Sequence, residues 1–136
     1  MADPVIAGND VFSHACVSTN DLESATRFYD AVLAPPGVKN MGPFGETIVL
    51  YGKDKPALLV LKPSNGQPAR VSNGAPLGFA AAAPAAVDAF HAAGVSNGGT
   101  DEGAAGPRGH LPGAHAAYLR DPAGNKVCAY TFVTSE

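Results

Sequence analysis

The sequence predicts an α+β fold built from two modules, each with the order strand, helix, strand, strand, strand. Three observations predict it: an amphipathic helix near the start, short apolar runs separated by glycine and proline turns, and the same order of motifs in both halves. A chain of 136 residues has the length of one domain. We therefore expect a single domain over 1–136, with module 5–63 and module 76–134 joined by linker 64–75.

Composition places the chain among globular proteins, with 46% hydrophobic and 15% charged residues. Nine Lys and Arg against twelve Asp and Glu give a net charge of −3, which excludes nucleic-acid or membrane binding driven by positive charge. No apolar run approaches the ~18 residues of a membrane span. No secretory signal pattern is present, so we expect a cytoplasmic protein with Cys16 and Cys128 reduced.

The first module begins with a predicted strand over 13–18, which places His14, Cys16 and Ser18 on one face. A helix follows, with Asn20 as its N-cap and Glu23 completing a capping box. Its apolar residues recur at helical spacing. They are Leu22, Ala25, Phe28, Tyr29, Val32 and Leu33.

Extended segments are then expected at 38–41, 47–51 and 57–61. The segments 42–45 and 52–55 supply the turns between them. The linker region that follows is rich in Gly, Pro, Ser and Asn, which is typical of a connector.

The second module repeats this order. A strand at 77–81 precedes a helix over 84–94, and a long glycine-rich loop with at most one weak strand occupies 98–114. The last two strands are expected at 116–119 and 126–132. The apolar side of the helix contains Ala86, Val87 and Phe90.

Two short motifs recur in the same order in both halves. Residues 42–45, Gly-Pro-Phe-Gly, have a counterpart in 106–109, Gly-Pro-Arg-Gly. The turn that begins at Tyr51 has one in the turn that begins at Tyr118. Matching order and similar offsets indicate an internal duplication.

Segments 12–17 and 20–29 resemble the opening of vicinal-oxygen-chelate proteins, and 119–127 is similar to their Asp-Pro-x-Gly-Asn turn before the final strand. That superfamily includes glyoxalase I, bleomycin-resistance proteins, fosfomycin-modifying enzymes and extradiol dioxygenases. The resemblance runs from about 11 to 132 and implies a glyoxalase-like domain whose mixed sheets curl into a cup. It also implies a divalent metal such as zinc, nickel, manganese or iron in the cup, a small-molecule substrate and a homodimer.

The chain departs from the family's ligand pattern. His14 matches the ligand of the first strand, whereas Pro76 and Cys128 stand where the family has His and Glu, and 58–61 offers no Glu. We therefore expect no cofactor or only a weakly bound metal. Two functions follow: a protein that binds a small molecule in the cup, or a metal-dependent lyase or dioxygenase that uses His14 with other ligands.

Several residues are candidates for the site, each with a structural alternative. His14 is a metal ligand or catalytic base, or an ordinary strand histidine. Cys128 is a thiolate ligand to the same metal, or a small buried apolar residue. Cys16 shares the face of His14 and would contact substrate or join a ligand cluster with these two residues.

Further candidates lie in the second module. His110 and His115 would close over the cup, or bind an anionic substrate together with Arg108, or remain solvated. Tyr118 and Tyr130 would line the cup wall and contact substrate, or belong to the core. The apolar strand at 57–61 suggests a sheet edge or face that a second chain covers in a homodimer.

Overall fold

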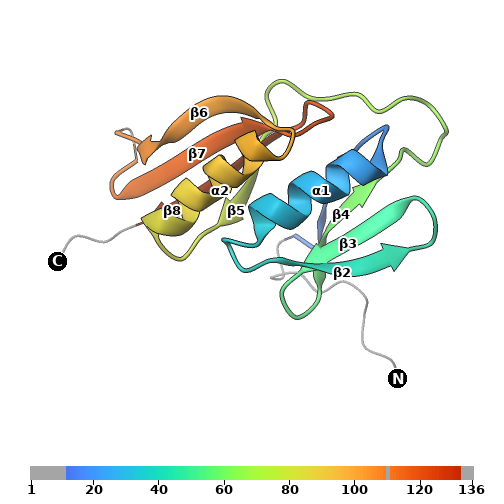
Figure 1. Cartoon of the computed structure of the whole chain (residues 1–136), viewed down its shortest axis with the longest axis horizontal. Coiled ribbons are helices and arrows are strands. Elements are labelled where there is room, and N and C mark those ends of the chain that lie inside the picture. The colour runs from blue at the N-terminus through green and yellow to red at the C-terminus, as the bar shows by residue number, and fades with distance from the viewer. Residues whose placement is uncertain (1–11, 110, 133–136) are drawn as a thin grey trace.

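Each half of the chain forms a four-stranded sheet with one helix, as Figure 1 shows. The computed structural model describes residues 12–109 and 111–132. The first half contains β1 (Ala15–Ser18), α1 (Leu22–Leu33), β2 (Lys39–Phe44), β3 (Ile48–Gly52) and β4 (Pro56–Leu61). The second contains β5 (Leu77–Ala80), α2 (Pro84–Ser96), β6 (Thr100–Pro107), β7 (Ala114–Arg120) and β8 (Lys126–Phe132). The predicted α+β fold with two βαβββ modules is confirmed.

The two sheets have the same topology. Their strand orders are β1-β4-β3-β2 and β5-β8-β7-β6, so the first strand of each module pairs with its last. That pairing is parallel in both sheets, and the remaining pairs are antiparallel. Neither sheet closes into a barrel, which agrees with the expected curled cup. Because β4 lies between β1 and β3, it is not a sheet edge, and of the two predicted alternatives only a covered face remains for this apolar strand.

Helix α1 begins one residue later than its predicted cap. Asp21, not Asn20, is the N-cap, and its carboxylate accepts hydrogen bonds from the amides of Glu23 and Ser24 at 3.1 and 3.2 Å. A carboxylate also suits the positive end of the helix dipole. Asn20 instead contacts the connector, because its side-chain oxygen accepts a hydrogen bond from the Ala69 amide at 2.7 Å.

Two segments expected as turn or loop are strand. Residues 42–44 belong to β2, and the predicted turn there shifts to 45–47. Gly42 sits at a bulge with a φ of 100°, a conformation that glycine adopts without steric strain. Residues 100–107 of the predicted glycine-rich loop form β6, which pairs with β7 through two register shifts. Pairing across the sheet overrides the weak strand propensity of glycine here.

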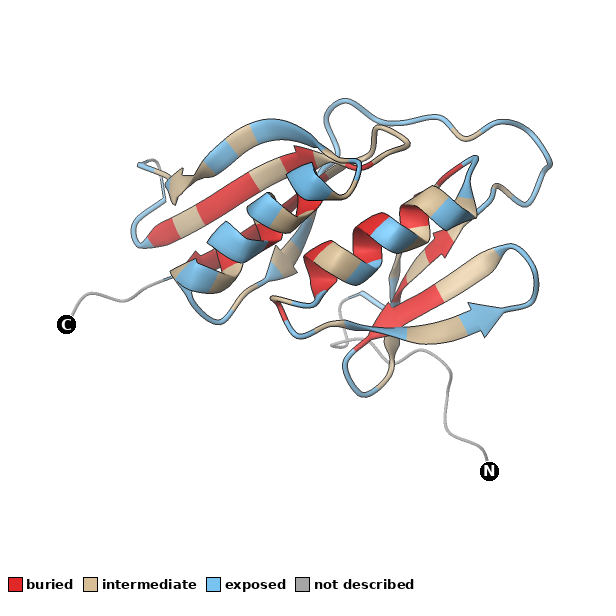
Figure 2. Ribbon diagram, viewed as in Figure 1, coloured by how far each residue is buried: buried red, intermediate tan, exposed pale blue. Residues whose placement is uncertain are grey.

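A continuous core lies between the helices and the sheets, and Figure 2 shows it along the inner sides of both helices. The predicted apolar side of α1 is buried except for Leu22, which packs at the edge of the core. Helix α2 buries Val87 and Phe90 and continues past Gly94 to Ser96. Gly94 is buried, and a side chain there would collide with Leu119 of β7. Neither helix among the described residues is long and apolar enough to cross a membrane.

A buried polar link joins the two modules. The Tyr29 hydroxyl of α1 donates a hydrogen bond of 2.6 Å to Asp121, which is 3% exposed and lies in the turn between β7 and β8. The other oxygen of Asp121 accepts from the amides of Ala123 and Asn125 and shapes the turn. The Asn125 side chain in turn donates to the Ser18 carbonyl at the end of β1, at 2.7 Å. The Asp-Pro-x-Gly-Asn turn therefore ties the second module to the first.

We predict that Tyr29→Phe destabilises the protein by about 2 kcal/mol, because it removes one donor from a buried carboxylate. Tyr51→Phe is the matched control: its ring is also fully buried, but its hydroxyl donates to the exposed Asp30. Water can replace that bond, so the control should lose at most about 1 kcal/mol. Urea unfolding followed by circular dichroism measures both; equal losses would contradict the role given to the Tyr29–Asp121 bond.

Candidate functional site

The helices cover one face of each sheet, and no helix of the described residues lies on the other face. On β8, Val127 and Ala129 are fully buried in the core, so Cys128 and Tyr130 project to the opposite face. On β7, Ala117 and Leu119 belong to the core, which places Tyr118 on the same open face. We call this surface the open face of the second sheet.

Two tyrosines meet on this face. The hydroxyl groups of Tyr118 and Tyr130 share a hydrogen bond of 2.5 Å, and their rings pack edge to face with centroids 5.9 Å apart. They come from antiparallel neighbours, in which Tyr118 pairs with Cys128 and Tyr130 with Ala116. The pair is therefore diagonal across two strands, a spacing that aromatic side chains can bridge.

Two cations flank the Tyr118 ring. The Arg108 guanidinium carbon lies 5.7 Å from the ring centroid, and the Lys126 ammonium nitrogen lies 5.4 Å from it. Arg108 is held by the carbonyls of the β6 end, with hydrogen bonds to Ala104 and Gly106 at 3.1 and 3.2 Å. We call Arg108, Tyr118, Lys126 and Tyr130 the tyrosine–cation cluster.

Cys128 lies beneath this cluster. Its side chain is nearly buried, and a side chain on the neighbouring Gly78 of β5 would come within 3.3 Å of the sulfur. Burial raises the pKa of the thiol to about 11, although a hydrogen bond with Tyr118 and the charges of Lys126 and Arg108 act in the opposite direction. Cys128 therefore remains a thiol at neutral pH.

Burial also raises the pKa of the Tyr118 hydroxyl, and the hydrogen bond with Tyr130 acts in the same direction. The Tyr118 phenol therefore keeps its proton at neutral pH. A neutral phenol can both donate and accept a hydrogen bond. The site thus presents a hydroxyl pair beside two positive charges.

A cavity of about 520 Å³ adjoins the cluster through Tyr130, which is one of its lining residues. Tyr130 and Phe132 line one side of it, and Gly78 and Ala80 of β5 line another. The rings of Tyr130 and Phe132 are stacked with centroids 5.8 Å apart and an interplanar angle of 19°, and Phe132 is 61% exposed. This volume falls within the range of small-molecule sites, about 300–1,000 Å³.

Cys16 lies in β1 of the first sheet, whereas His14 directly precedes this strand, which begins at Ala15 and not at residue 13 as predicted. His14 shares a 2.9 Å hydrogen bond with the neighbouring Ser13 hydroxyl. Cys16 pairs with Leu59 and faces away from the core, because its neighbour Val17 is buried there. Among residues 12–109 and 111–132, no three His, Cys, Asp or Glu side chains are grouped so that they could hold a metal ion. The structure therefore does not bring these two residues into such a group with Cys128.

His115 belongs to the helix side of the second sheet. Its ring nitrogen Nε2 lies 2.8 Å from the Asp88 carboxylate of α2, and α2 forms a similar pair between His91 and Asp101. Both pairs attach α2 to strands. His115 therefore does not meet Tyr118 and Tyr130, which lie on the open face. His110 falls outside the described residues.

Lys126 is a site residue that the sequence analysis missed. A usable signal was present: alternation along β8 places residues 126, 128 and 130 on one face. Arg108 was named as an anion-binding candidate, and the structure places it beside Tyr118 rather than beside His115.

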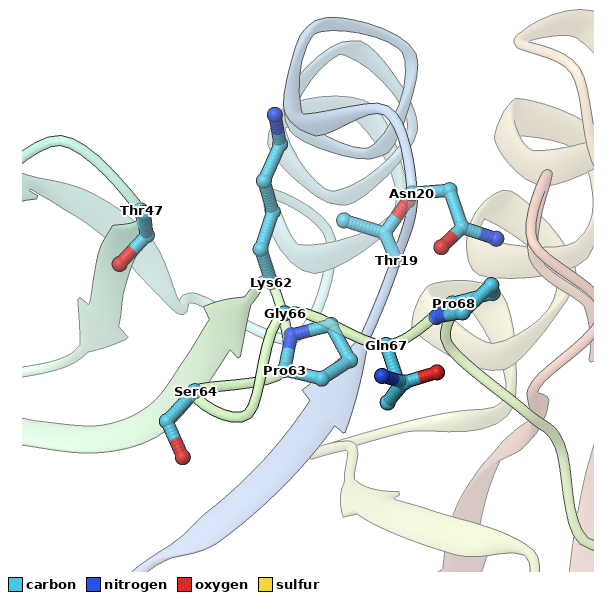
Figure 3. A pocket seen from close by; sticks show the side chains of 9 residues that line it. All are labelled: Thr19, Asn20, Thr47, Lys62, Pro63, Ser64, Gly66, Gln67 and Pro68. Carbon is cyan, nitrogen blue, oxygen red and sulfur yellow. The ribbon is translucent and has the colours of Figure 1, made fainter.

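A second cavity, of about 750 Å³, lies at the other end of the molecule (Figure 3). Thr19 and Asn20 before α1 and residues 62–68 of the connector line it, together with Thr47. Figure 3 shows that the Lys62, Ser64 and Thr47 side chains point in different directions, not toward a common point. This cavity therefore offers no convergent polar set, in contrast to the tyrosine–cation cluster.

Comparison with solved structures places the chain among known folds. A glyoxalase/bleomycin resistance protein from Albidiferax ferrireducens T118 is 46% identical over 88% of this chain and 96% of its own, with a TM-score of 0.78. A glyoxalase/bleomycin resistance protein/dioxygenase family enzyme from Burkholderia phytofirmans PsJN is 16% identical over 89% and 98% of the two chains, with a TM-score of 0.68. Lactoylglutathione lyase from Agrobacterium tumefaciens is 23% identical over 86% and 90%, with a TM-score of 0.59.

The last two likenesses establish only a shared fold, because their identities are low. No model of a protein family matches the chain, and no curated protein matches it either. The Albidiferax protein is different, because close to half of its aligned residues are identical and the alignment spans nearly its whole length. The chain therefore belongs to the glyoxalase/bleomycin resistance protein family.

Proposed function

We propose that this protein binds a small molecule on the open face of its second sheet, at the tyrosine–cation cluster. The observation that carries the proposal is the hydrogen-bonded pair of Tyr118 and Tyr130 hydroxyls beside a cavity of about 520 Å³. A small-molecule site combines an apolar wall with a few fixed polar groups. Phe132 and the β5 residues supply the wall, and the hydroxyl pair supplies the polar groups.

The alternative, metal-dependent lyase or dioxygenase chemistry with His14, finds no support in the donor set. A catalytic metal needs about three protein ligands at one point. His14 is hydrogen-bonded to Ser13 through Nδ1 and so offers one donor, Nε2, and Cys128 carries a proton that a thiolate ligand would have to lose. Pro76 has no side-chain donor. The described residues do not group into a set of donors that fits a metal centre, so the proposal is for binding.

We also propose that two copies of the chain pair through the open face of the first sheet. Phe44, Ile48 and Leu61 lie in register on this face, and Leu50 pairs with Leu59 beside them. Phe44 is 56% exposed and Ile48 and Leu61 are partly exposed, whereas Leu50 is buried with 8% of its surface exposed. A contiguous apolar sheet surface of this kind is typical of an interface. A second copy would bury it.

We expect a screen of small aromatic compounds to give ligands that shift the ring signals of Tyr118 and Tyr130 in NMR spectra of tyrosine-labelled protein. Replacing both tyrosines by Phe should weaken such ligands about tenfold, because two hydroxyl hydrogen bonds are lost. Val95→Ala, on an exposed part of α2, is the control and should leave affinity unchanged. A screen with no ligand at the cluster would contradict the proposal.

Cys128 should react with iodoacetamide at pH 8 far more slowly than Cys16. Burial raises the pKa of both thiols, but Cys16 is exposed whereas Cys128 is nearly buried and has a pKa of about 11. Intact mass and peptide mapping over time measure the two rates. Fast labelling of Cys128 would mean that the thiol is accessible and ionised, which would reopen its role as a metal ligand.

Light scattering at micromolar concentration should give twice the mass of one chain. Phe44→Glu should shift the protein toward the monomer, because it places a charge in the apolar face. Val95→Glu introduces the same charge on α2 and should leave the dimer intact. A wild-type protein with the mass of one chain would rule out the proposed pairing.

A further inference from the structure

The positive charges of the tyrosine–cation cluster have no acidic partner among the described residues. The ion pairs among the described residues lie outside the cluster: Glu102 pairs with Arg120, Asp101 with His91, and Asp88 with His115. Within residues 12–109 and 111–132, Arg108 donates only to backbone carbonyls, and no hydrogen bond or ion pair joins the Lys126 ammonium group to a carboxylate. The protein as a whole carries a net charge of −3, so the cluster is a local positive site on an acidic molecule.

The hydroxyl pair has a hydrogen to spare. Tyr118 and Tyr130 carry two phenolic protons, and one of them lies between the two oxygens. The other is available to a further acceptor. When Tyr130 donates within the pair, the remaining proton is on Tyr118, where the acceptor among the described cluster residues is the Cys128 sulfur, which accepts hydrogen bonds weakly. A carboxylate oxygen would accept that proton more strongly than sulfur does.

The apolar wall begins directly beside these polar groups. Phe132 stacks on Tyr130, and the cavity extends along the two rings to the small residues of β5. A flat apolar group could lie there while an attached acidic group reached the hydroxyl pair and the cations. Tyr130 belongs both to the hydroxyl pair and to the cavity wall, so the positive cluster and the apolar cavity adjoin each other at this residue.

We infer that the ligand of this site is a small organic anion, with its acidic group held by Arg108, Lys126 and the tyrosine hydroxyls and its apolar body in the cavity beside Phe132. This inference rests on the proposed function and specifies its ligand class. The two cations would neutralise the charge of the anion, and the hydroxyl pair would orient its acidic group. The anion replaces the carboxylate partner that the described chain does not supply there.

Benzoate and benzamide test the inference, because they share one ring and nearly one shape and differ in charge. Calorimetric titration of the full chain should show benzoate binding about tenfold more tightly than benzamide, with affinity falling as salt rises. NMR of the tyrosine rings should place benzoate at Tyr118 and Tyr130. Inorganic phosphate, which has the charge but no apolar body, should bind more weakly than benzoate.

Variants assign the charge effect to the cluster. Lys126→Gln and Arg108→Gln should each weaken benzoate about tenfold and leave benzamide unchanged, and Lys126→Arg should restore most of the loss. Lys39→Gln, on the outer strand of the first sheet, is the matched control and should bind benzoate like the wild type. Circular dichroism verifies that each variant is folded.

Equal affinities for benzoate and benzamide at the cluster would overturn the anion inference and leave the proposed function intact. The inference would also be overturned if benzoate shifted NMR signals of residues outside the cluster and bound Lys126→Gln as tightly as the wild type. If neither probe reaches the cluster while the screen of aromatic compounds gives neutral ligands there, only the anion inference fails. If that screen also finds nothing at the cluster, both proposals fail.

Discussion

The buried hydrogen bond between Tyr29 and Asp121 fixes the second module against the first. It connects α1 to the turn that joins β7 and β8, and the same turn reaches the end of β1 through Asn125. A carboxylate that is 3% exposed is costly unless donors surround it, so the turn and α1 have to meet in one geometry. The position of β7 and β8, and with them Tyr118 and Tyr130, follows from that constraint.

Both modules obey the same rule, in which a helix covers one face of a sheet and alternation leaves every second side chain on the other face. The two open faces nevertheless differ in chemistry. The first presents Leu59, Leu61 and Phe44, and the second presents Lys126, Cys128 and Tyr130. A repeated backbone thus carries an apolar surface in one half and a polar site in the other. Association and ligand binding can therefore occupy different modules.

Family membership does not choose among these uses, because one fold hosts many reactions. The side chains of this protein reduce the number of functions that the fold could support. A protonated thiol and a proline stand at two positions where the family resemblance implies metal ligands, and two cations with no acidic partner among the described residues stand beside a phenol pair. This combination favours recognition of a charged small molecule by hydrogen bonds and charge. It does not favour activation by a metal ion.

Local sequence patterns predicted both helices, the same order of elements in the two halves, most strands and the turn at Asp121. They did so because helical periodicity and turn propensity depend on residues that are close together in the sequence. Predictions from local patterns were wrong where a contact with another segment of the chain determines the structure. Asp21 caps α1 while Asn20 is engaged by Ala69, and glycine-rich β6 is a strand because β7 pairs with it. The same holds for the site: His115 pairs with Asp88, and Lys126 lies over Tyr118. The contacts of Asn20 with Ala69 and of His115 with Asp88 join residues far apart in the chain, so no local spacing specifies them. Alternation along β8 does place Lys126 on the face of Tyr130, but the partner on the neighbouring strand depends on the register of pairing.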